Sequence, residues 1–155
     1  SAFPDASSVI LFEKRRFVYD DRDYVYPVIE RHLRVLIRNN EGVKYWGDYS
    51  LGGTDVKFSK IRAATYALEH GRVVMTELDK DAVITDRKSS HEKIFSLPKL
   101  KDGCIIELSW TATYLRSVSP SRTIQYDLPV LWSEYLLGAT RPLTILTSGG
   151  MDPPP

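Results

Sequence analysis

A thiol and an imidazole could together perform covalent chemistry in this 155-residue sequence. Cys104 is the single cysteine, and His91 could act as its base if a third group oriented the imidazole ring. However, Cys104 is in phase with Ile106 and Trp110 in a run where apolar residues alternate with polar ones. We therefore expect the thiol to be a small buried hydrophobic group with a raised pKa, and not a nucleophile.

Metal ligands are sparse in the sequence. The three histidines are His32, His70 and His91. They are far apart, and none has a Cys, Asp or Glu at a familiar ligand spacing. The acidic turn formed by Asp20, Asp21 and Asp23 could contact calcium, but it lacks the glycine and the distal glutamate of a calcium-binding loop. We therefore predict no metal site and no cofactor.

A small aromatic cluster is the best candidate for ligand contact. Trp46 lies close to Tyr45 and Tyr49, and aromatic faces of this kind can stack on sugar rings. Trp46 alternates with Lys44 and Asp48, so the pattern leaves its exposure open. A buried Trp46 would favour structural packing, whereas an exposed Trp46 in a shallow groove would favour carbohydrate binding.

The elements that must position these residues are predicted to be strands. The sequence has 12 Val, 10 Ile, 10 Thr and 17 aromatic residues, which suit the pleated surface of a sheet. Period-two alternation is clearest over residues 104–115 and again over 24–38, where Ile29 and Leu33 share one face and His32 lies on the other. Pro27 cannot donate a ladder hydrogen bond, so this second strand should start at an edge or a bulge.

Turn residues separate the predicted strands. Residues 62–68 and 72–78 flank Glu69-His70-Gly71, which predicts a hairpin with a three-residue loop. Residues 39–42 predict a turn before a strand over 43–50. The less regular segment 79–90 predicts either one short strand over 82–85 or a helical turn. The sequence therefore predicts an all-β fold, an antiparallel two-sheet sandwich with little helix.

Composition limits the domain organisation and the partners. The 21 basic and 20 acidic residues give a net charge of +1, so no overall field attracts nucleic acid or an anionic membrane. No apolar run approaches the roughly 18 residues of a membrane span. We predict a single domain over residues 1–147 and a flexible Gly/Pro-rich tail over 148–155.

Several segments together resemble a known domain family. The most specific block, residues 93–110, contains Leu97-Pro98, Gly103 and Ile105-Ile106-Glu107 before an aromatic residue. Further similar segments are residues 4–11, 31–42, 61–65, 71–73 and 124–135. In order and spacing they resemble, over residues 4–137, a bacterial domain family of unknown function. That family occurs at the N-terminus of multidomain proteins, ahead of a transglutaminase-like domain with the papain-type cysteine protease fold.

The resemblance implies a fold, a location and a role. It implies an immunoglobulin-like or related antiparallel sandwich in an exported protein that faces the periplasm or the cell surface. The family's catalytic Cys, His and Asp belong to the downstream domain and have no counterpart here. We therefore expect a non-catalytic accessory domain that positions the downstream transglutaminase-like domain or its polypeptide substrate. The alternative is a carbohydrate-binding module that uses Tyr45, Trp46 and Tyr49.

Overall fold

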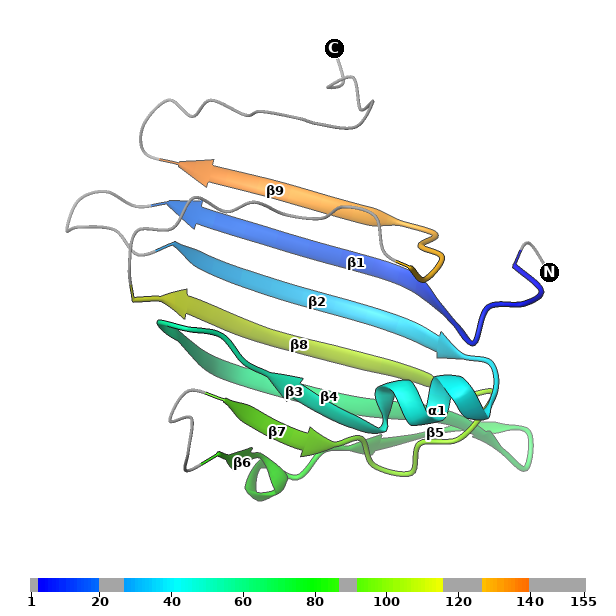
Figure 1. The fold of residues 1–155 in the computed structure, drawn as a ribbon. Helices are drawn as coiled ribbons and strands as arrows, with labels where there is room; N and C mark the ends of the chain where they lie inside the picture. The colour runs from blue at the N-terminus through cyan, green and yellow to red at the C-terminus, as the bar shows by residue number, and fades with distance from the viewer. Residues whose placement is uncertain (1–2, 20–26, 87–91, 116–126, 140–155) are drawn as a thin grey trace, which may run out of the picture.

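The computed structural model describes residues 3–19, 27–86, 92–115 and 127–139. Within these ranges the chain forms a six-stranded sheet in the order β5-β4-β8-β2-β1-β9 and a three-stranded sheet in the order β3-β7-β6 (Figure 1). The large sheet contains β1 (Ser8–Tyr19), β2 (Val28–Ile37), β4 (Val56–Glu69), β5 (Arg72–Glu77), β8 (Ile105–Tyr114) and β9 (Ser133–Ala139). The small sheet contains β3 (Asp48–Leu51), β6 (Ile84–Thr85) and β7 (Lys93–Ser96). The predicted mostly-β, two-sheet architecture is confirmed.

One strand pair departs from the predicted antiparallel arrangement. All other neighbours are antiparallel, but β1 pairs with β9 in parallel, from Glu13 opposite Ser133 to Tyr19 opposite Ala139. The two strands come from distant parts of the chain, so no hairpin turn signals their pairing in the sequence. The parallel strand β9 forms one edge of the large sheet.

The predicted alternation is confirmed along the two central strands. In β8 the buried residues include Ile106, Leu108 and Trp110, with Cys104 just before the strand also buried. In β2 the buried residues are Ile29, Leu33, Val35 and Ile37, while the residues between them are at least partly exposed. Because side chains alternate between faces, these sets form one apolar inner face of the large sheet.

The predicted strand over residues 43–50 is wrong in its first half. Residues Asn40–Gly47 form an eight-residue helix, α1, and only Asp48 to Leu51 continue as β3. The side chain of Asn39 accepts hydrogen bonds from the backbone N–H groups of Glu41 and Gly42, at 3.0 and 3.1 Å, and so caps the helix. The buried residues of α1 are Gly42 and Trp46, four residues apart, which is the spacing of one helix face.

The hairpin after β4 is confirmed, but its loop is one residue shorter than predicted. Glu69 pairs with Arg72, so the loop contains only His70 and Gly71. Both have positive φ, at 49° and 75°, as a primed hairpin turn requires. The segment around residues 80–85 contains both alternatives that the sequence left open, a 3-10 turn at Lys80–Ala82 and the short strand β6.

Pro27 does not mark an edge strand. It immediately precedes β2, which lies inside the large sheet between β1 and β8. Its carbonyl oxygen accepts a hydrogen bond of 3.1 Å from the N–H of Tyr114. The missing N–H of the proline therefore falls just outside the β2 ladder.

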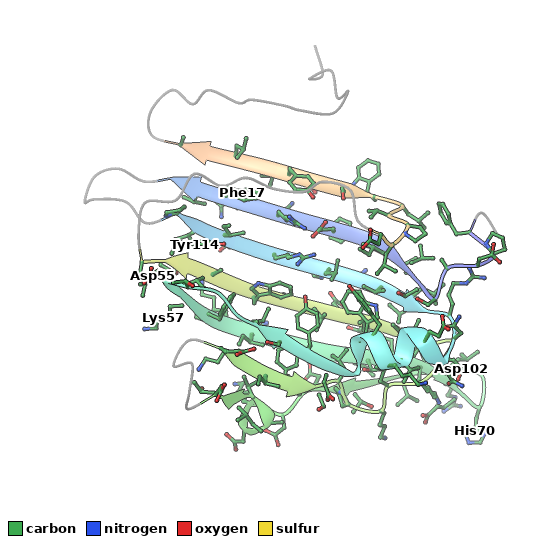
Figure 2. All side chains as sticks on the ribbon, viewed as in Figure 1. Phe17, Asp55, Lys57, His70, Asp102 and Tyr114 are labelled. Carbon is green, nitrogen blue, oxygen red and sulfur yellow. The ribbon has the colours of Figure 1, made fainter. Side chains whose placement is uncertain are left out.

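The small sheet and α1 lie on one side of the large sheet, over β8 and β4 rather than over β1 and β9 (Figure 1). The core therefore forms between the two layers. Trp46 of α1, Leu51 of β3 and Phe95 of β7 pack against the inner face of the large sheet. Figure 2 shows Phe17 and Tyr114 at one end of the sheet, and His70 and Asp102 at the other. Neither helical segment in the described ranges combines the length and apolar character needed to cross a membrane.

Three predictions fall outside the described residues. They are the flexible tail over 148–155, the acidic turn at Asp20, Asp21 and Asp23, and the placement of His91. The fold of residues 140–147, the last part of the predicted domain, also lies outside them.

Candidate functional site

The three predicted ligand-contact residues do not form an exposed platform. Trp46 is only 4% exposed, and its indole N–H donates a hydrogen bond of 3.1 Å to the hydroxyl of Ser8. Its ring stacks on that of Tyr49 with 5.8 Å between centroids. Tyr45 alone of the three is well exposed, at 66%. The burial of Trp46 favours structural packing over carbohydrate stacking.

Cys104 lies where the sequence predicts it. The residue is fully buried, and its carbonyl oxygen accepts a hydrogen bond of 2.9 Å from the N–H of Ile37. Burial raises the pKa of the thiol, because the charged thiolate would lose its hydration. The prediction of a buried thiol with a raised pKa is therefore confirmed.

A groove of about 300 Å³ opens beside the small sheet, on the inner face of the large sheet. Among its lining residues are Arg15 from β1, Arg31 from β2, Trp110 and Tyr114 from β8, Phe58 from β4, and residues 49–52 in and after β3. Tyr114 places one end of this groove at the end of the sheet that Figure 2 marks with Phe17 and Tyr114. The site therefore lies between the two layers, where β3 passes over the large sheet.

Strand register aligns three of the lining residues, Arg15, Arg31 and Trp110, and places Tyr135 next to Arg15. Arg15 is opposite Arg31 in the β1–β2 pair, Arg31 is opposite Trp110 in the β2–β8 pair, and Tyr135 is opposite Arg15 in the β1–β9 pair. The four side chains consequently form one row across the inner face, because directly opposed residues point to the same side of a sheet.

A buried carboxylate joins the two arginines. Oε1 of Glu13 accepts hydrogen bonds from Nε of Arg15 and from Nε of Arg31, both at 2.7 Å. The Glu13 side chain has no exposed surface, and the Arg15 and Arg31 side chains are 9% and 20% exposed. One carboxylate oxygen of Glu13 therefore contacts two guanidinium groups. Charge-assisted hydrogen bonds at this distance are strong and hold the guanidinium groups in fixed orientations.

Aromatic rings support the same guanidinium groups. The Cζ atom of Arg15 lies 5.4 Å from the ring centroid of Tyr135, and that of Arg31 lies 5.1 Å from the ring centroid of Trp110. Both distances allow cation–π attraction. Burial raises the pKa of the Tyr135 phenol, although the charge of Arg15 acts in the opposite direction. The phenol therefore stays neutral beside the arginine at physiological pH.

Tyr49 connects the groove to the core. Its ring lies 5.7 Å from that of Trp110 and 5.6 Å from that of Phe95, between centroids. Burial raises the pKa of Tyr49, and the positive charge of Arg31 only partly offsets this effect. Tyr49 therefore lines the groove as an uncharged phenol, and its ring packs between β3 and Trp110 of the large sheet.

The open edge of β3 forms one side of the groove. β3 is the outer strand of the small sheet and pairs only with β7 among the described strands. The N–H of Leu97 donates a hydrogen bond of 3.0 Å to the carbonyl oxygen of Gly47. In an antiparallel pair, every second residue forms such bonds with the partner strand, so the bonded positions that follow Gly47 are Tyr49 and Leu51. By this alternation Tyr49 and Leu51 bond to β7, and the backbone N–H and C=O of Ser50 point away from it.

The arginine cluster was not singled out from the sequence, although a signal for it was present. Glu13 and Arg15 lie in phase with buried Phe17, and Arg31 lies in phase with Ile29 and Leu33. Charged residues that recur at apolar positions of two strands indicate a buried charge network. Only the register shows that the two strands are neighbours.

A second polar cluster lies on the opposite face of the large sheet. Nε2 of His32 is 2.5 Å from Oε1 of Glu107, and Arg34 donates to the same oxygen at 3.2 Å. Although partial burial alone would raise the pKa of Glu107, hydrogen bonds from His32, Arg34 and Tyr66 lower it overall. Among the described residues no group of three or more His, Cys, Asp or Glu side chains could hold a metal ion.

Taken together, these features define a two-layered β domain with a groove that is lined by two arginines and several aromatic rings beside an open strand edge. No protein-family model and no curated protein matches the sequence. Among solved structures, the fold is similar to part of the crystal structure of a putative protease from Parabacteroides distasonis ATCC 8503, with a TM-score of 0.62 and 9% sequence identity. The similarity covers 86% of this chain and 29% of that chain, so this chain corresponds to less than a third of the matched protein.

Proposed function

We propose that this chain is a non-catalytic accessory domain of an exported bacterial protein with a transglutaminase-like, putative cysteine protease domain. The domain positions that catalytic domain or its polypeptide substrate. The observation that carries the proposal is the structural match: this fold occurs as a minor part of a larger putative protease. The segments that resemble the accessory-domain family point to the same arrangement, with the catalytic domain downstream.

An exposed apolar surface supports a contact with a neighbouring domain. Leu131, Trp132, Leu136 and Leu137 are 57%, 63%, 40% and 49% exposed, and all lie in or just before the edge strand β9. Exposed apolar groups concentrated in one segment are typical of an interaction surface. We name residues 131–137 the β9 surface and propose that the downstream domain packs against it.

The state of Cys104 supports a non-catalytic role. A cysteine nucleophile needs an accessible thiolate in an electropositive setting, whereas this thiol is buried and its pKa is raised. We propose the periplasm or the cell surface as the location, as the sequence resemblance implies. The burial of Trp46 leaves no specific observation in favour of a carbohydrate-binding module.

A docking experiment tests the accessory role. The domain encoded directly after this chain is produced separately, and its binding to the chain is measured by calorimetry. We expect saturable binding that weakens at least about tenfold, roughly 1.4 kcal/mol, in a Trp132→Asp variant. Val73→Asp, which changes a residue that is also well exposed, on the opposite edge strand β5, is the matched control. A gene that encodes no further domain, or binding that is unaffected by Trp132→Asp, would overturn the proposal.

An activity assay tests the absence of catalysis. The purified chain is incubated with fluorogenic peptide, ester and acyl-transfer substrates, and the native thiol is titrated with a coloured disulfide reagent. We expect no turnover and slow labelling that accelerates on unfolding. Turnover that disappears in Cys104→Ala would show that the chain is itself an enzyme.

A further inference from the structure

We propose that the chain forms a two-fold symmetric dimer in which β5 pairs, antiparallel, with β5 of a second copy, and that the symmetry axis passes beside Met75. The two six-stranded large sheets then continue into each other across the axis. The inference goes beyond the accessory function and does not depend on it. It concerns the edge of the large sheet that lies opposite to β9 (Figure 1).

Half of the backbone groups of β5 point away from β4. Among the described strands, β5 pairs only with β4. The N–H of Leu78 donates a hydrogen bond of 2.8 Å to the carbonyl oxygen of Ala63, which continues the β4–β5 register by one residue. Bonded pairs alternate in an antiparallel ladder, so the even-numbered residues of β5 bond to β4. The N–H and C=O groups of Val73, Met75 and Glu77 consequently point to the open edge.

β5 has none of the usual features that protect a sheet edge from pairing. The strand contains no Pro and no Lys, and its register with β4 has no bulge. The side chains of Val73 and Met75 are apolar and 72% and 50% exposed. An apolar edge strand without these features is a template for a further strand. We therefore expect β5 to pair with a strand from outside the chain.

The charges of β5 select a second copy as the partner. Arg72 is the first residue of the strand and Glu77 the last, and the four residues between them are uncharged. In an antiparallel pair of two β5 strands, the positive end of each copy lies beside the negative end of the other. A parallel pair would bring like charges together, which is destabilising. The strand is therefore complementary to itself in the direction that a two-fold axis produces.

The edge groups determine the register of this pair. An axis beside Met75 places Met75 opposite its own symmetry mate and Val73 opposite Glu77 of the other copy. In each copy all three residues whose backbone groups point to the edge are then hydrogen-bonded. An axis beside Val74 would place Glu77 opposite Gly71, in the hairpin turn, and would lose one bonded pair. The register centred on Met75 therefore satisfies the most backbone groups.

The same register extends an apolar row on the outer face of the large sheet, which is turned away from the small sheet. Met75 is opposite Tyr66, Tyr66 is opposite Ile105, and Ile105 is opposite Leu36, across β5, β4, β8 and β2. Directly opposed residues point to the same side of a sheet. The axis beside Met75 joins two such rows end to end, and the two Met75 side chains cover each other. Burial of this exposed apolar surface stabilises the dimer.

Sedimentation equilibrium of the unmodified chain tests the self-association. Because one strand edge is a small interface, we expect a reversible equilibrium in which the dimer fraction rises with concentration. Met75→Lys places two ammonium groups side by side at the axis and should weaken the dimer at least about tenfold. Leu68→Lys is the matched control, because it changes an exposed apolar residue on the same face but on the inner strand β4. It should leave the dimer unchanged.

Three results of this measurement would overturn the inference. They are a chain that stays monomeric up to about 1 mM, a mass that grows beyond the dimer, and equal dissociation constants for the two lysine variants. Circular dichroism and melting temperature verify that each variant is folded.

Engineered cysteines test the register. Bonded antiparallel partners have Cα atoms about 5.5 Å apart, which a disulfide can span. Under mild oxidation, Met75→Cys should therefore cross-link to its own copy. Val73→Cys should not, because its symmetry mate is four residues away along the strand, more than about 13 Å. A mixture of Val73→Cys and Glu77→Cys chains should cross-link, since these two positions are opposed.

The unmodified chain is the control for cross-linking, because its one thiol, at Cys104, is buried. No cross-link in Met75→Cys, or equal cross-linking in Met75→Cys and Val73→Cys, would overturn the pairing. Val73→Asp separates this interface from the β9 surface. It places a second carboxylate opposite Glu77 and should weaken the dimer, whereas docking at β9 should be unchanged. A Val73→Asp variant that dimerises like the unmodified chain would also overturn the pairing.

Discussion

Arg31 and Trp110 face each other across the β2–β8 pair, with the Cζ atom of the arginine 5.1 Å from the centroid of the indole ring. The same guanidinium donates from Nε to Glu13 at 2.7 Å. A cation is thus held between a carboxylate and an aromatic face inside a two-layered β domain. This contact joins the charge network of β1 and β2 to the packed aromatic residues of β8 and β3.

The buried carboxylate should be essential to this network. In Glu13→Gln the two guanidinium groups lose their shared anion, and a buried cation without its counter-charge is costly. We expect the free energy of unfolding to fall by about 3–5 kcal/mol, measured by urea denaturation. Glu134→Gln, which removes the partly exposed partner of Lys14, is the control and should cost less than about 1 kcal/mol. Equal losses in the two variants would contradict the prediction.

Glu107 should stabilise the fold at neutral pH but not in acid. Its pKa in the folded chain is lowered from the ordinary value of 4.5, so the folded state favours the carboxylate. This contribution is present above pH 4.5 and is lost as pH falls through the folded pKa. Glu107→Gln should therefore be less stable than the unmodified chain at pH 7, and the two should converge in acid.

Denaturation series at several pH values measure this difference. Glu30→Gln, which removes the exposed partner of Arg16 on the same face, is the matched control. A gap for Glu107→Gln that stays constant down to strongly acidic pH would show that the variant loses packing and not charge stabilisation.

Tyr49 should make the fold sensitive to alkali. Burial raises its pKa above the ordinary value of 10.0, so the folded chain keeps the phenol neutral while the unfolded chain ionises. The contribution is complete below pH 10.0 and is lost as pH rises towards the folded pKa. Tyr49→Phe cannot ionise, and its stability should decline less above pH 10 than that of the unmodified chain.

Thermal melts between neutral and alkaline pH measure the effect. Tyr45→Phe removes the neighbouring exposed phenol and should follow the unmodified chain. If Tyr49→Phe also follows the unmodified chain at every pH, the ionisation of this phenol is not coupled to folding.

Gly42 should tolerate no larger residue, although it lies in a helix. A Cβ atom at this position would overlap the carbonyl oxygen of Ser7, which is backbone and cannot rotate away. In an exposed helix the change from Gly to Ala is stabilising by about 1 kcal/mol. Here we expect Gly42→Ala to be destabilising by about 1–3 kcal/mol, because the helix must move away from the start of β1.

Gly47→Ala is the matched control for this position. It changes the last residue of the same helix, where an added Cβ meets no heavy atom within 4 Å. Denaturation midpoints that rank Gly42→Ala at or above Gly47→Ala would contradict the close approach of α1 to β1.

The sequence predicts the elements whose pattern is local. Alternation over residues 104–115 locates β8 to within one residue at each end and places Cys104 in the core. The hairpin at Gly71 is recognisable because glycine tolerates positive φ. In these segments, burial on one face imposes a period of two on the residues, and that period can be read without any partner strand.

The features that depend on distant pairing are not predictable in this way. The helix α1 was missed because only Gly42 and Trp46 of its short span are buried, and the capping role of Asn39 resembles an ordinary turn. The groove needs both the register of β1 with β2 and the position of β3 above them. Neither is encoded in a local period, so the charged residues Arg15 and Arg31 could not be assigned to one site.

The parallel pairing of β1 with β9 determines how late in synthesis the large sheet can be completed. Synthesis delivers β1 first, but its outer neighbour starts only at Ser133, after every other strand of the sheet has emerged. Throughout that interval β1 offers its unsatisfied side to any other nascent chain, which is a known route to aggregation. The large sheet can therefore close only after Ser133–Ala139 has been synthesised.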